Sequence, residues 1–269
     1  MKPRSNTRPS GTRSVSRAIS VLKTLGRSSN AYGLTDLGIA TGLSKATVFR
    51  LLGALETEGL VARDDASGAY RLGPELISLG ASALSTTRLR AVAHDELLRL
   101  AEESGETATL EVMTEGEILV VDEAKGRFLF GANPEIGRAW PAHATSTGKV
   151  LLALTDPMPA LLRLTRVGPK TITSRAELER ELARVRHQGY ALAIDELESG
   201  LSAIAAPVRN HLGFVVGAIS INGPGTRLGP TRRRTLIPKV ISAANRVSRR
   251  LGASSAMLVT PERKSRAAS

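Results

Sequence analysis

Four histidines are the residues of this sequence best suited to metal binding or acid–base catalysis, but none has a partner at a useful spacing. His94, His143, His187 and His211 form no HExxH or HxH pattern, so a metal site would need distant segments to converge. The 269 residues include no cysteine, which excludes disulfides, cysteine-ligated zinc, iron–sulfur clusters and thiol catalysis. We expect no metal site.

Nucleotide-binding and hydrolase motifs are absent as well. Gly148-Lys149 is not the end of a P-loop, because His143 stands where the first glycine should be and Val150 where Ser or Thr should be. GxGxxG is missing, and Ser146 is not in the GxSxG pattern of a nucleophile elbow. The sequence predicts no catalytic residue and no cofactor, so we do not expect an enzyme.

The segment Gly137–Lys149 is unusual, because a strand end and a proline turn lead into hydroxyl-rich residues that open a helix, expected over Ser146–Leu154. The unpaired N–H groups of such a helix start suit an anion or a carboxylate. The alternative is that Thr145 or Ser146 serves only as the helix cap, and both interpretations stay open. Trp140, the only tryptophan, is the kind of residue found more often in a core than in a ligand site.

A second helix start, at Ser44, points to different chemistry. Ser44 is a good N-cap, and after it the apolar residues form one stripe: Val48, Leu51, Leu52 and Leu55. At about 100° per residue, a second set faces away from that stripe, with Lys45, Thr47 and Phe49 on the flanks: Ala46, Arg50, Gly53 and Thr57. That outer face is small, polar and positive.

Such a face fits the major groove of DNA. Arg50 can donate two hydrogen bonds to guanine, while Lys45 and the Ser44 hydroxyl near the helix N-terminus suit phosphates. The alternative is an ordinary solvated helix face. The tight turn before Ser44, the hairpin predicted over residues 61–72 and the basic N-terminus together favour DNA binding.

The elements around this helix predict a winged helix-turn-helix. A helical period begins at Ser14, with an apolar face of Val15, Ile19, Leu22 and Leu25, and a short second helix spans Leu34–Thr41. After the third helix, Val61–Arg63 and Tyr70–Leu72 form a hairpin, the wing. We expect Arg63 and Arg71 of the wing to contact DNA beside Ser44, Lys45, Ala46, Thr47 and Arg50.

Beyond the wing, the sequence predicts a connector and an α+β domain. Residues 74–87 form a short amphipathic linker helix, which either pairs across a dimer or packs on its own domain. From residue 88 to 252, helices alternate with strands that hairpin turns join, including Thr107–Met113 with Ile118–Val121 and Ser202–Val208 with Phe214–Asn222. A capping box at Ser174–Glu177 opens one helix, and the last helix spans about Thr235–Leu251, with Pro238 near its start. We therefore expect an antiparallel sheet.

Charge and composition set the class of protein and its compartment. Residues 1–80 hold 11 basic against 6 acidic side chains, residues 81–227 hold 16 against 18, and residues 228–269 hold 10 against 1. Residues 1–12 and 253–269 are basic and poor in large apolar side chains, so we predict that they are disordered. The excess of basic residues at both ends of the chain favours a polyanionic partner. No apolar run approaches the ~20 residues of a membrane span, and no secretion signal follows Met1, so we expect a soluble cytoplasmic protein.

Several blocks in the same order resemble one family, the isocitrate lyase regulator (IclR) family of bacterial transcription regulators. The resemblance covers about residues 14–252 and depends on these blocks: residues 41–52, Tyr70–Gly73, Gly105–Thr107, Pro141–Thr145 with Gly148-Lys149, Ala205–Val208 and Ala218–Ser220. It implies a winged helix-turn-helix at residues 13–73, the linker helix, and a GAF-like effector-binding domain, assembled as a homodimer or a homotetramer.

The resemblance also implies site residues. The recognition helix starts at Lys45, with Thr47 and Arg50 as DNA contacts. The effector pocket would be lined by Leu129, Ala132, Trp140, Ser146, Thr147, Leu201, Ser220 and Asn222. The sequence departs from the family at Ala193, where some members have an aspartate that binds small acids, and at Ser202-Ala203, where the family has Arg-Cys. Those departures predict a larger, partly aromatic or apolar ligand, or a pocket that its own side chains fill.

The sequence thus predicts a regulator that binds double-stranded operator DNA and whose C-terminal domain binds a small effector, a carboxylic or aromatic compound. Two alternatives stay open. One is a nonspecific DNA-binding protein with a vestigial sensor domain, and the other is a small-molecule enzyme with an accessory basic domain.

Overall fold

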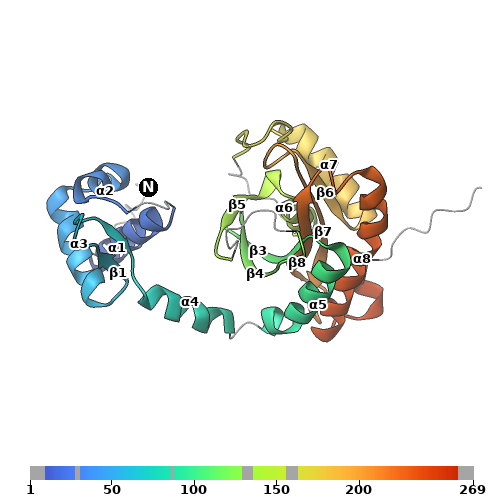
Figure 1. The fold of residues 1–269 in the computed structure, drawn as a ribbon, viewed down its shortest axis with the longest axis horizontal. Helices are drawn as coiled ribbons and strands as arrows, with labels where there is room; N and C mark the ends of the chain where they lie inside the picture. The colour runs from blue at the N-terminus through green and yellow to red at the C-terminus, as the bar shows by residue number, and fades with distance from the viewer. Residues whose placement is uncertain (1–9, 28–30, 86–87, 129–135, 156–162, 260–269) are drawn as a thin grey trace, which may run out of the picture. The chain divides into compact units, whose positions relative to one another are not determined.

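The computed structural model of this protein describes residues 10–27, 31–85, 88–128, 136–155 and 163–259. They belong to two compact units, residues 1–86 and 87–269 (Figure 1). In the described residues no helix is long and apolar enough to cross a membrane.

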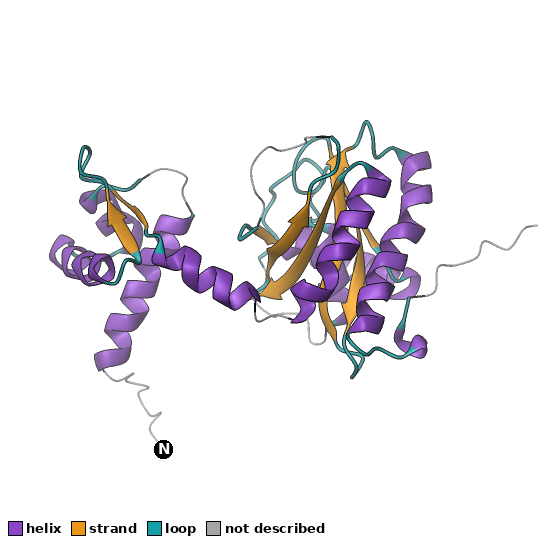
Figure 2. Cartoon of the chain, turned by 60° about the horizontal axis from the view of Figure 1, so that its bottom comes forward, coloured by secondary structure: helices purple, strands orange, loops and turns teal. Residues whose placement is uncertain are grey.

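The first unit is a helix-turn-helix with a β-wing. It contains α1 (Ser10–Gly26), α2 (Leu34–Thr41), α3 (Lys45–Thr57), β1 (Val61–Arg63), β2 (Tyr70–Leu72) and α4 (Glu75–Ser85). The wing is a pair of short strands (Figure 2). They are antiparallel, with Ala62 opposite Arg71. Between α2 and α3, Gly42 adopts a positive φ of 67°, a backbone conformation that glycine tolerates best. The turn is therefore tight, as predicted.

The core of this unit differs from the predicted one on α1. Val21 and Leu25 are buried together with Leu37, Val48, Leu52, Leu55, Val61 and Tyr70. Val15 and Ile19, predicted to face the core, are 58% and 47% exposed. That prediction was wrong, because the helical period alone gives two adjacent apolar faces on α1 and only one meets α2 and α3. In addition α1 begins at Ser10, so residues 10–12, assigned to the arm, are helical.

The second unit is an antiparallel sheet of six strands with helices on both faces. The strands in sheet order are β5 (Ala139–Pro141), β4 (Glu117–Ala124), β3 (Thr107–Thr114), β8 (Val215–Pro224), β7 (Leu201–Arg209) and β6 (Ala191–Ile194). The helices are α5 (Arg88–Ser104), α6 (Ser146–Leu154), α7 (Arg175–Gln188) and α8 (Pro230–Arg250). The structure confirms the predicted α+β class.

Strand alternation divides the core of this unit in two. On β7, Ile204, Ala206 and Val208 pack with α5 and α8, whereas Ala205 packs with α6 and α7. Figure 1 shows α5 and α8 together beside the sheet. Because both faces of the central strands are covered, β7 and β8 are nearly continuously buried, and the first turn of α6 lies against the sheet.

Local details of this unit depart from the sequence prediction. Ser174 precedes α7 but its side chain makes no cap hydrogen bond, so the capping box is not formed. α8 begins at Pro230, which places Pro238 inside the helix rather than near its start. Residues 253–259, predicted as part of a disordered tail, fold back onto α8, where the Asn245 amide exchanges hydrogen bonds of 2.8 and 3.1 Å with the Val259 backbone.

Candidate DNA-binding surface and effector pocket

The first turn of α3 is fixed by its cap. The Ser44 hydroxyl accepts a hydrogen bond from the Thr47 N–H at 3.3 Å and lies 2.8 Å from the Thr47 hydroxyl. Val48 and Leu52 are fully buried on the opposite side. Ser44, Lys45 and Ala46 are exposed. The helix start is therefore open to solvent, while apolar packing on the other side sets the orientation of the helix in the unit.

The exposed face of α3 carries the residues predicted for it, Ala46, Arg50, Gly53 and Thr57, and Lys45 on its flank is exposed as well. Neither Lys45 nor Arg50 makes an ion pair in the described part of the chain. Thr47 is half-buried and its hydroxyl is engaged with Ser44. The structure therefore leaves Lys45 and Arg50 available to a polyanion.

The two wing arginines differ in their surroundings. Arg63 donates from Nε to the Gly68 carbonyl at 3.4 Å and stacks 5.7 Å from the centre of the Tyr70 ring. Arg71 is exposed on the neighbouring strand. At the wing tip, Asp64 accepts two hydrogen bonds from Ser67, which lower the pKa of its carboxyl. The tip is thus held by its own hydrogen bonds.

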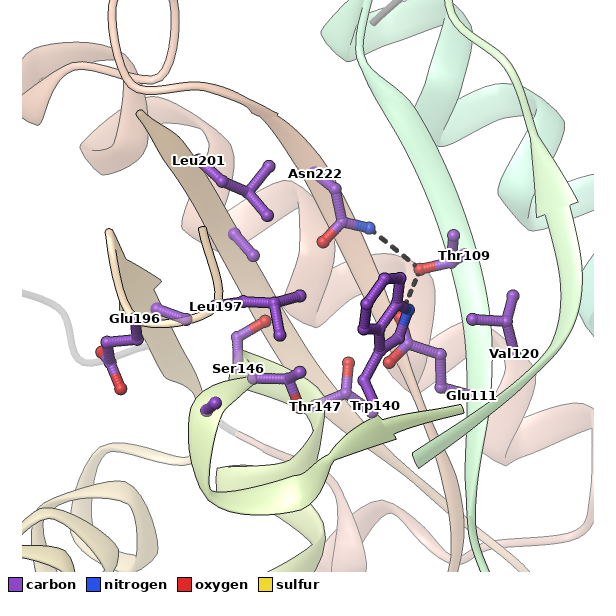
Figure 3. A pocket seen from close by; sticks show the side chains of 14 residues that line it. Thr109, Glu111, Val120, Trp140, Ser146, Thr147, Glu196, Leu197, Leu201 and Asn222 are labelled. Atoms are coloured by element: carbon purple, nitrogen blue, oxygen red, sulfur yellow. Dashed lines mark hydrogen bonds between the residues drawn. The ribbon is translucent and has the colours of Figure 1, made fainter. Parts of the chain in front are cut away.

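The second unit contains a cavity of about 60 Å³ at the start of α6, which we call the α6 cavity (Figure 3). It is lined by Thr109, Glu111, Val120, Trp140, Ala144, Thr145, Ser146, Thr147, Ala193, Glu196, Leu197, Leu201, Ala203 and Asn222. Of the described residues that line it, two are carboxylates and none is lysine, arginine or histidine. Trp140, Leu197 and Leu201 supply the large apolar walls.

The start of α6 presents hydroxyls to this cavity. Thr145 is the N-cap and accepts a hydrogen bond from the Gly148 N–H at 2.9 Å, so the capping interpretation is correct for Thr145. Ser146 and Thr147 are buried and also line the cavity. Among the described residues the Thr147 hydroxyl has no hydrogen-bond partner, although a buried hydroxyl normally has one. The cavity therefore holds an unused hydrogen-bonding group.

A polar network closes the opposite side of the cavity. Thr109 and Ser220 donate to the same oxygen of Glu111, at 2.6 and 3.0 Å. The Asn222 amide donates to the Thr109 and Ser220 hydroxyls at 3.1 and 3.0 Å. Figure 3 shows the bonds from Asn222 and Thr109 beside Trp140. Glu111, although buried, is stabilised as an acceptor by these donors.

A buried ion pair connects α6 to the segment after β6 and to α7. The Lys149 ammonium, 1% exposed, lies 2.7 Å from Glu196 and 3.3 Å from Glu181. Burial raises the pKa of the Glu196 carboxyl, although Lys149 opposes the shift. Glu196 follows β6 and Glu181 lies on α7, so Lys149 joins three segments.

The predicted pocket residues fall into three groups. Trp140, Ser146, Thr147, Leu201 and Asn222 line the α6 cavity, as do Ala193 and Ala203. Ser220 lies behind the lining, where it holds Glu111 and Asn222. Leu129 and Ala132 lie outside the described residues.

Sequence reasoning missed other lining residues: Thr109, Glu111, Glu196 and Leu197. Thr109 and Glu111 lie two apart on β3, and that alternation of polar side chains in an otherwise apolar strand was the available signal. The described residues contain no group of His, Asp or Glu that could hold a metal ion.

Two family models match this chain. Residues 14–65 match the IclR helix-turn-helix domain, and residues 81–249 match the domain described as "Bacterial transcriptional regulator IclR C-terminal".

Similar proteins cover nearly the whole chain. The Glycerol operon regulatory protein of Streptomyces griseus is 36% identical, over 89% of this chain and 96% of that protein. The HTH-type transcriptional regulator XynR of Escherichia coli is 32% identical, over 89% and 97%. The crystal structure of an IclR homolog from Microbacterium hydrocarbonoxydans, complexed with 4-hydroxybenzoate, is 28% identical with a TM-score of 0.74, over 90% of this chain and 100% of that one.

Proposed function

Because this chain belongs to the IclR family of bacterial transcriptional regulators, we propose that it recognises a specific operator through α3 and the wing, and that a small molecule in the α6 cavity alters this binding. The family is one of DNA-binding regulators with a C-terminal effector domain, not of enzymes. The operator, the effector and the contact residues are our proposal.

The observation that carries the DNA-binding part is the exposed cationic start of α3. Arg50 lies on the face opposite the buried Val48 and Leu52, and its planar guanidinium can donate two hydrogen bonds to a guanine. Lys45, one residue after the cap, provides a charge for a backbone phosphate. Ala46 and Gly53 are small enough to let the helix approach base edges closely.

Footprinting of the full-length protein on its upstream DNA separates the proposed function from nonspecific binding. We expect a discrete protected site with approximate two-fold symmetry. Affinity should fall by orders of magnitude between about 50 and 200 mM salt, because several phosphate contacts release counterions. Uniform protection along the fragment would instead support the nonspecific binder.

For the effector, we propose a small compound with an aromatic or apolar body and one polar group, a carboxylate or a hydroxyl, placed at the start of α6. Trp140, Leu197 and Leu201 would contact the body, and the Thr147 hydroxyl would contact the polar group. The ligand of the Microbacterium homolog, 4-hydroxybenzoate, combines these features. Because the described lining holds two carboxylates, Glu111 and Glu196, and no lysine, arginine or histidine, an uncharged phenol is expected to bind at least as well as a carboxylate.

The size of the cavity connects binding to regulation. An enclosed space of about 150 Å³ holds benzene, whereas the α6 cavity has about 60 Å³, so an aromatic effector must displace part of the wall. Leu197 and Leu201 flank the turn after β6, the segment that Lys149 ties to α6 through Glu196. Binding would shift the DNA-binding equilibrium only as far as ligand affinity differs between the two arrangements.

A thermal-shift screen of phenolic and carboxylic metabolites tests the effector site. A ligand at 100 times its Kd should stabilise the protein by about 2.7 kcal/mol. Thr147→Val keeps the shape of the side chain and removes only the unpartnered hydroxyl. It should leave the ligand-free protein at least as stable and weaken the ligand by about tenfold. Equal affinity in wild type and Thr147→Val would contradict the placement of the polar group.

We further propose that the protein acts as a homodimer or a homotetramer, with exposed apolar side chains of the first unit in the dimer contact. Val15, Ile19 and Ile77 are 58%, 47% and 75% exposed, and burying them against a second copy would remove apolar area from water. Sedimentation of the double variant Val15→Asp/Ile19→Asp should show a lower association state than wild type. An unchanged association state would exclude this surface of α1.

A further inference from the structure

The second unit contains another cavity, of about 450 Å³, which we call the α7 cavity. It is lined by Leu154, Arg186, His187, Gln188, Gly189, Arg209, Gly213, Ala256, Met257, Leu258 and Val259. These residues come from the ends of α6 and α7, the β7–β8 hairpin and the segment after α8, and none of them lines the α6 cavity. Its volume is within the range of small-molecule sites.

The charge of the α7 cavity is opposite to that of the α6 cavity. Arg186 and Arg209 line it, and among the described residues no aspartate or glutamate does. In the described part of the chain Arg186 donates to the Ala153 carbonyl at 2.7 Å and Arg209 to the Gly213 carbonyl at 2.8 Å, and neither makes an ion pair with a carboxylate. The Arg209 Nε is buried, and no described residue is its hydrogen-bond partner.

Two other half-buried arginines of this unit each pair with a carboxylate, unlike Arg209 among the described residues. Arg227 lies 2.6 Å from Glu106, and Arg246 lies 2.7 Å from Glu96. Within the described ranges Arg209 has no such counterion, and burial lowers the pKa of its guanidinium. A partly desolvated cation without an anion is costly, so an anion in the cavity would offset that cost.

His187 and Gln188 are the other polar lining residues, and the part of the wall formed by α6 and the segment after α8 is apolar. Leu154, Met257 and Val259 contribute to it. Val259 is held by Asn245 and packs so closely on Gly189 that a Cβ there would lie 2.4 Å from Val259 Cγ1. Met257 lies against Gly213, where a Cβ would be 3.3 Å from its sulfur. The wall that Met257 and Val259 form is therefore part of the folded unit.

We propose that the α7 cavity is a second ligand site, for a small organic carboxylate whose carboxyl group pairs with Arg186 and Arg209 and whose apolar part contacts Met257 and Val259. Guanidinium groups match a carboxylate geometrically. The apolar wall favours an organic acid over inorganic phosphate. This site is separate from the effector site proposed above, and its ligand need not be the effector.

Calorimetric titration of the full chain with hexanoate tests the proposal, with hexanol and inorganic phosphate as comparisons. Trp140, the only tryptophan, lines the α6 cavity, so its fluorescence identifies binding there. We expect hexanoate to bind with little change in Trp140 emission, and hexanol and phosphate to bind at least tenfold more weakly wherever Trp140 emission is unchanged. Equal binding of hexanol or phosphate with unchanged Trp140 emission, or no heat with hexanoate, would overturn the proposal.

Variants assign the heat to this cavity. Arg209→Gln should weaken hexanoate by about tenfold or more, and Met257→Asp should do the same by repelling the carboxylate while leaving both arginines in place. Arg180→Gln, on the exposed side of α7 and outside the lining, and Thr147→Val in the α6 cavity should leave hexanoate binding unchanged. Unchanged binding in both Arg209→Gln and Met257→Asp, with folding verified by circular dichroism, would place the ligand elsewhere.

Discussion

Two helices of this protein, α3 and α6, begin in the same way and are placed in opposite surroundings. Each starts with a hydroxyl cap, Ser44 on α3 and Thr145 on α6, that accepts a hydrogen bond from the N–H three residues later. The first turn of α3 is largely exposed, whereas the whole first turn of α6 is buried. In the function proposed above, the same kind of helix start meets a large polyanion in one unit and a small enclosed ligand in the other, and the difference in burial accounts for the difference in role.

The difference in burial between α3 and α6 can be tested by replacing one lysine with methionine in each helix. Lys149→Met leaves Glu181 and Glu196 without their buried cation and should cost about 3–5 kcal/mol of unfolding free energy. Lys45→Met removes an exposed charge, so its effect on stability should lie within about 0.5 kcal/mol. Urea unfolding measures both, with Trp140 fluorescence reporting the second unit. Similar costs would mean that Lys149 is not buried as the structure places it.

The matched lysine variant on α3 should instead change DNA binding. Lys45→Met is expected to reduce affinity for operator and random DNA alike and to reduce the salt slope by about one, because it removes one phosphate contact. Lys149→Met, studied where it remains folded, should leave the salt slope unchanged. A salt slope that Lys45→Met does not alter would remove Lys45 from the DNA contacts.

A second matched pair uses glycine. A Cβ added at Gly148 would lie 1.9 Å from the Ala142 carbonyl oxygen, whereas a Cβ at Gly53 meets nothing within 4 Å. Gly148→Ala should therefore destabilise the second unit by about 3 kcal/mol through overpacking. Gly53→Ala should stabilise the first unit by up to about 1 kcal/mol through helix propensity. Calorimetric melting gives both signs, and effects of the same sign would contradict the packing around α6.

The sequence predicts those features of the two units that depend on neighbouring residues of one helix or strand. The cap at Ser44 and the buried stripe Val48, Leu52 and Leu55 come from neighbours on one helix, and the structure confirms them. The exposed face of α1 was missed because the choice between two apolar faces depends on how α2 and α3 pack. In the second unit, β5 and β6 are short and contribute few residues each, so no period marks them.

The α6 cavity was predictable only in part for the same reason. Trp140, Ser146 and Thr147 belong to one unusual segment, and the resemblance to the family placed them in the pocket. Glu111 and Asn222 are connected through the Thr109 and Ser220 hydroxyls because β3 pairs with β8 in one register, and Lys149 pairs with Glu196 across 47 residues. Pairings of that kind depend on the tertiary fold and carry no pattern in the sequence.

The cap hydroxyls give a smaller effect. Ser44→Ala should cost about 1 kcal/mol. Thr145→Ala should cost more, about 1–2 kcal/mol, because it leaves the Gly148 N–H without its acceptor in a buried helix start. Thr145→Ser is the control that restores the acceptor. Equal losses for the exposed and the buried cap, measured by urea unfolding, would argue that burial does not separate the two helix starts.

The pH dependence of the Lys149 site is the smallest of these effects. The folded-state pKa of Glu196 is raised above its ordinary value of 4.5, because burial disfavours the carboxylate. Its contribution to stability is therefore present below pH 4.5 and is lost as the pH rises through the folded-state value. In Lys149→Met the attraction to the lysine is gone, so that loss should extend to higher pH. Urea unfolding of both proteins between roughly pH 4 and 8 tests this, and parallel pH profiles would contradict the coupling.

The most direct test of the central claim, that the exposed face of α3 recognises DNA, is the ratio of operator to random-DNA affinity in Arg50→Ala. Arg180→Ala, which removes an exposed arginine from α7, is the control for net charge. At fixed salt, Arg50→Ala should lower the ratio by about 1–3 kcal/mol, since one bidentate base contact is lost, and Arg180→Ala should leave it unchanged. An unchanged ratio in Arg50→Ala would contradict the account, because it would mean that this face of α3 does not contact the bases.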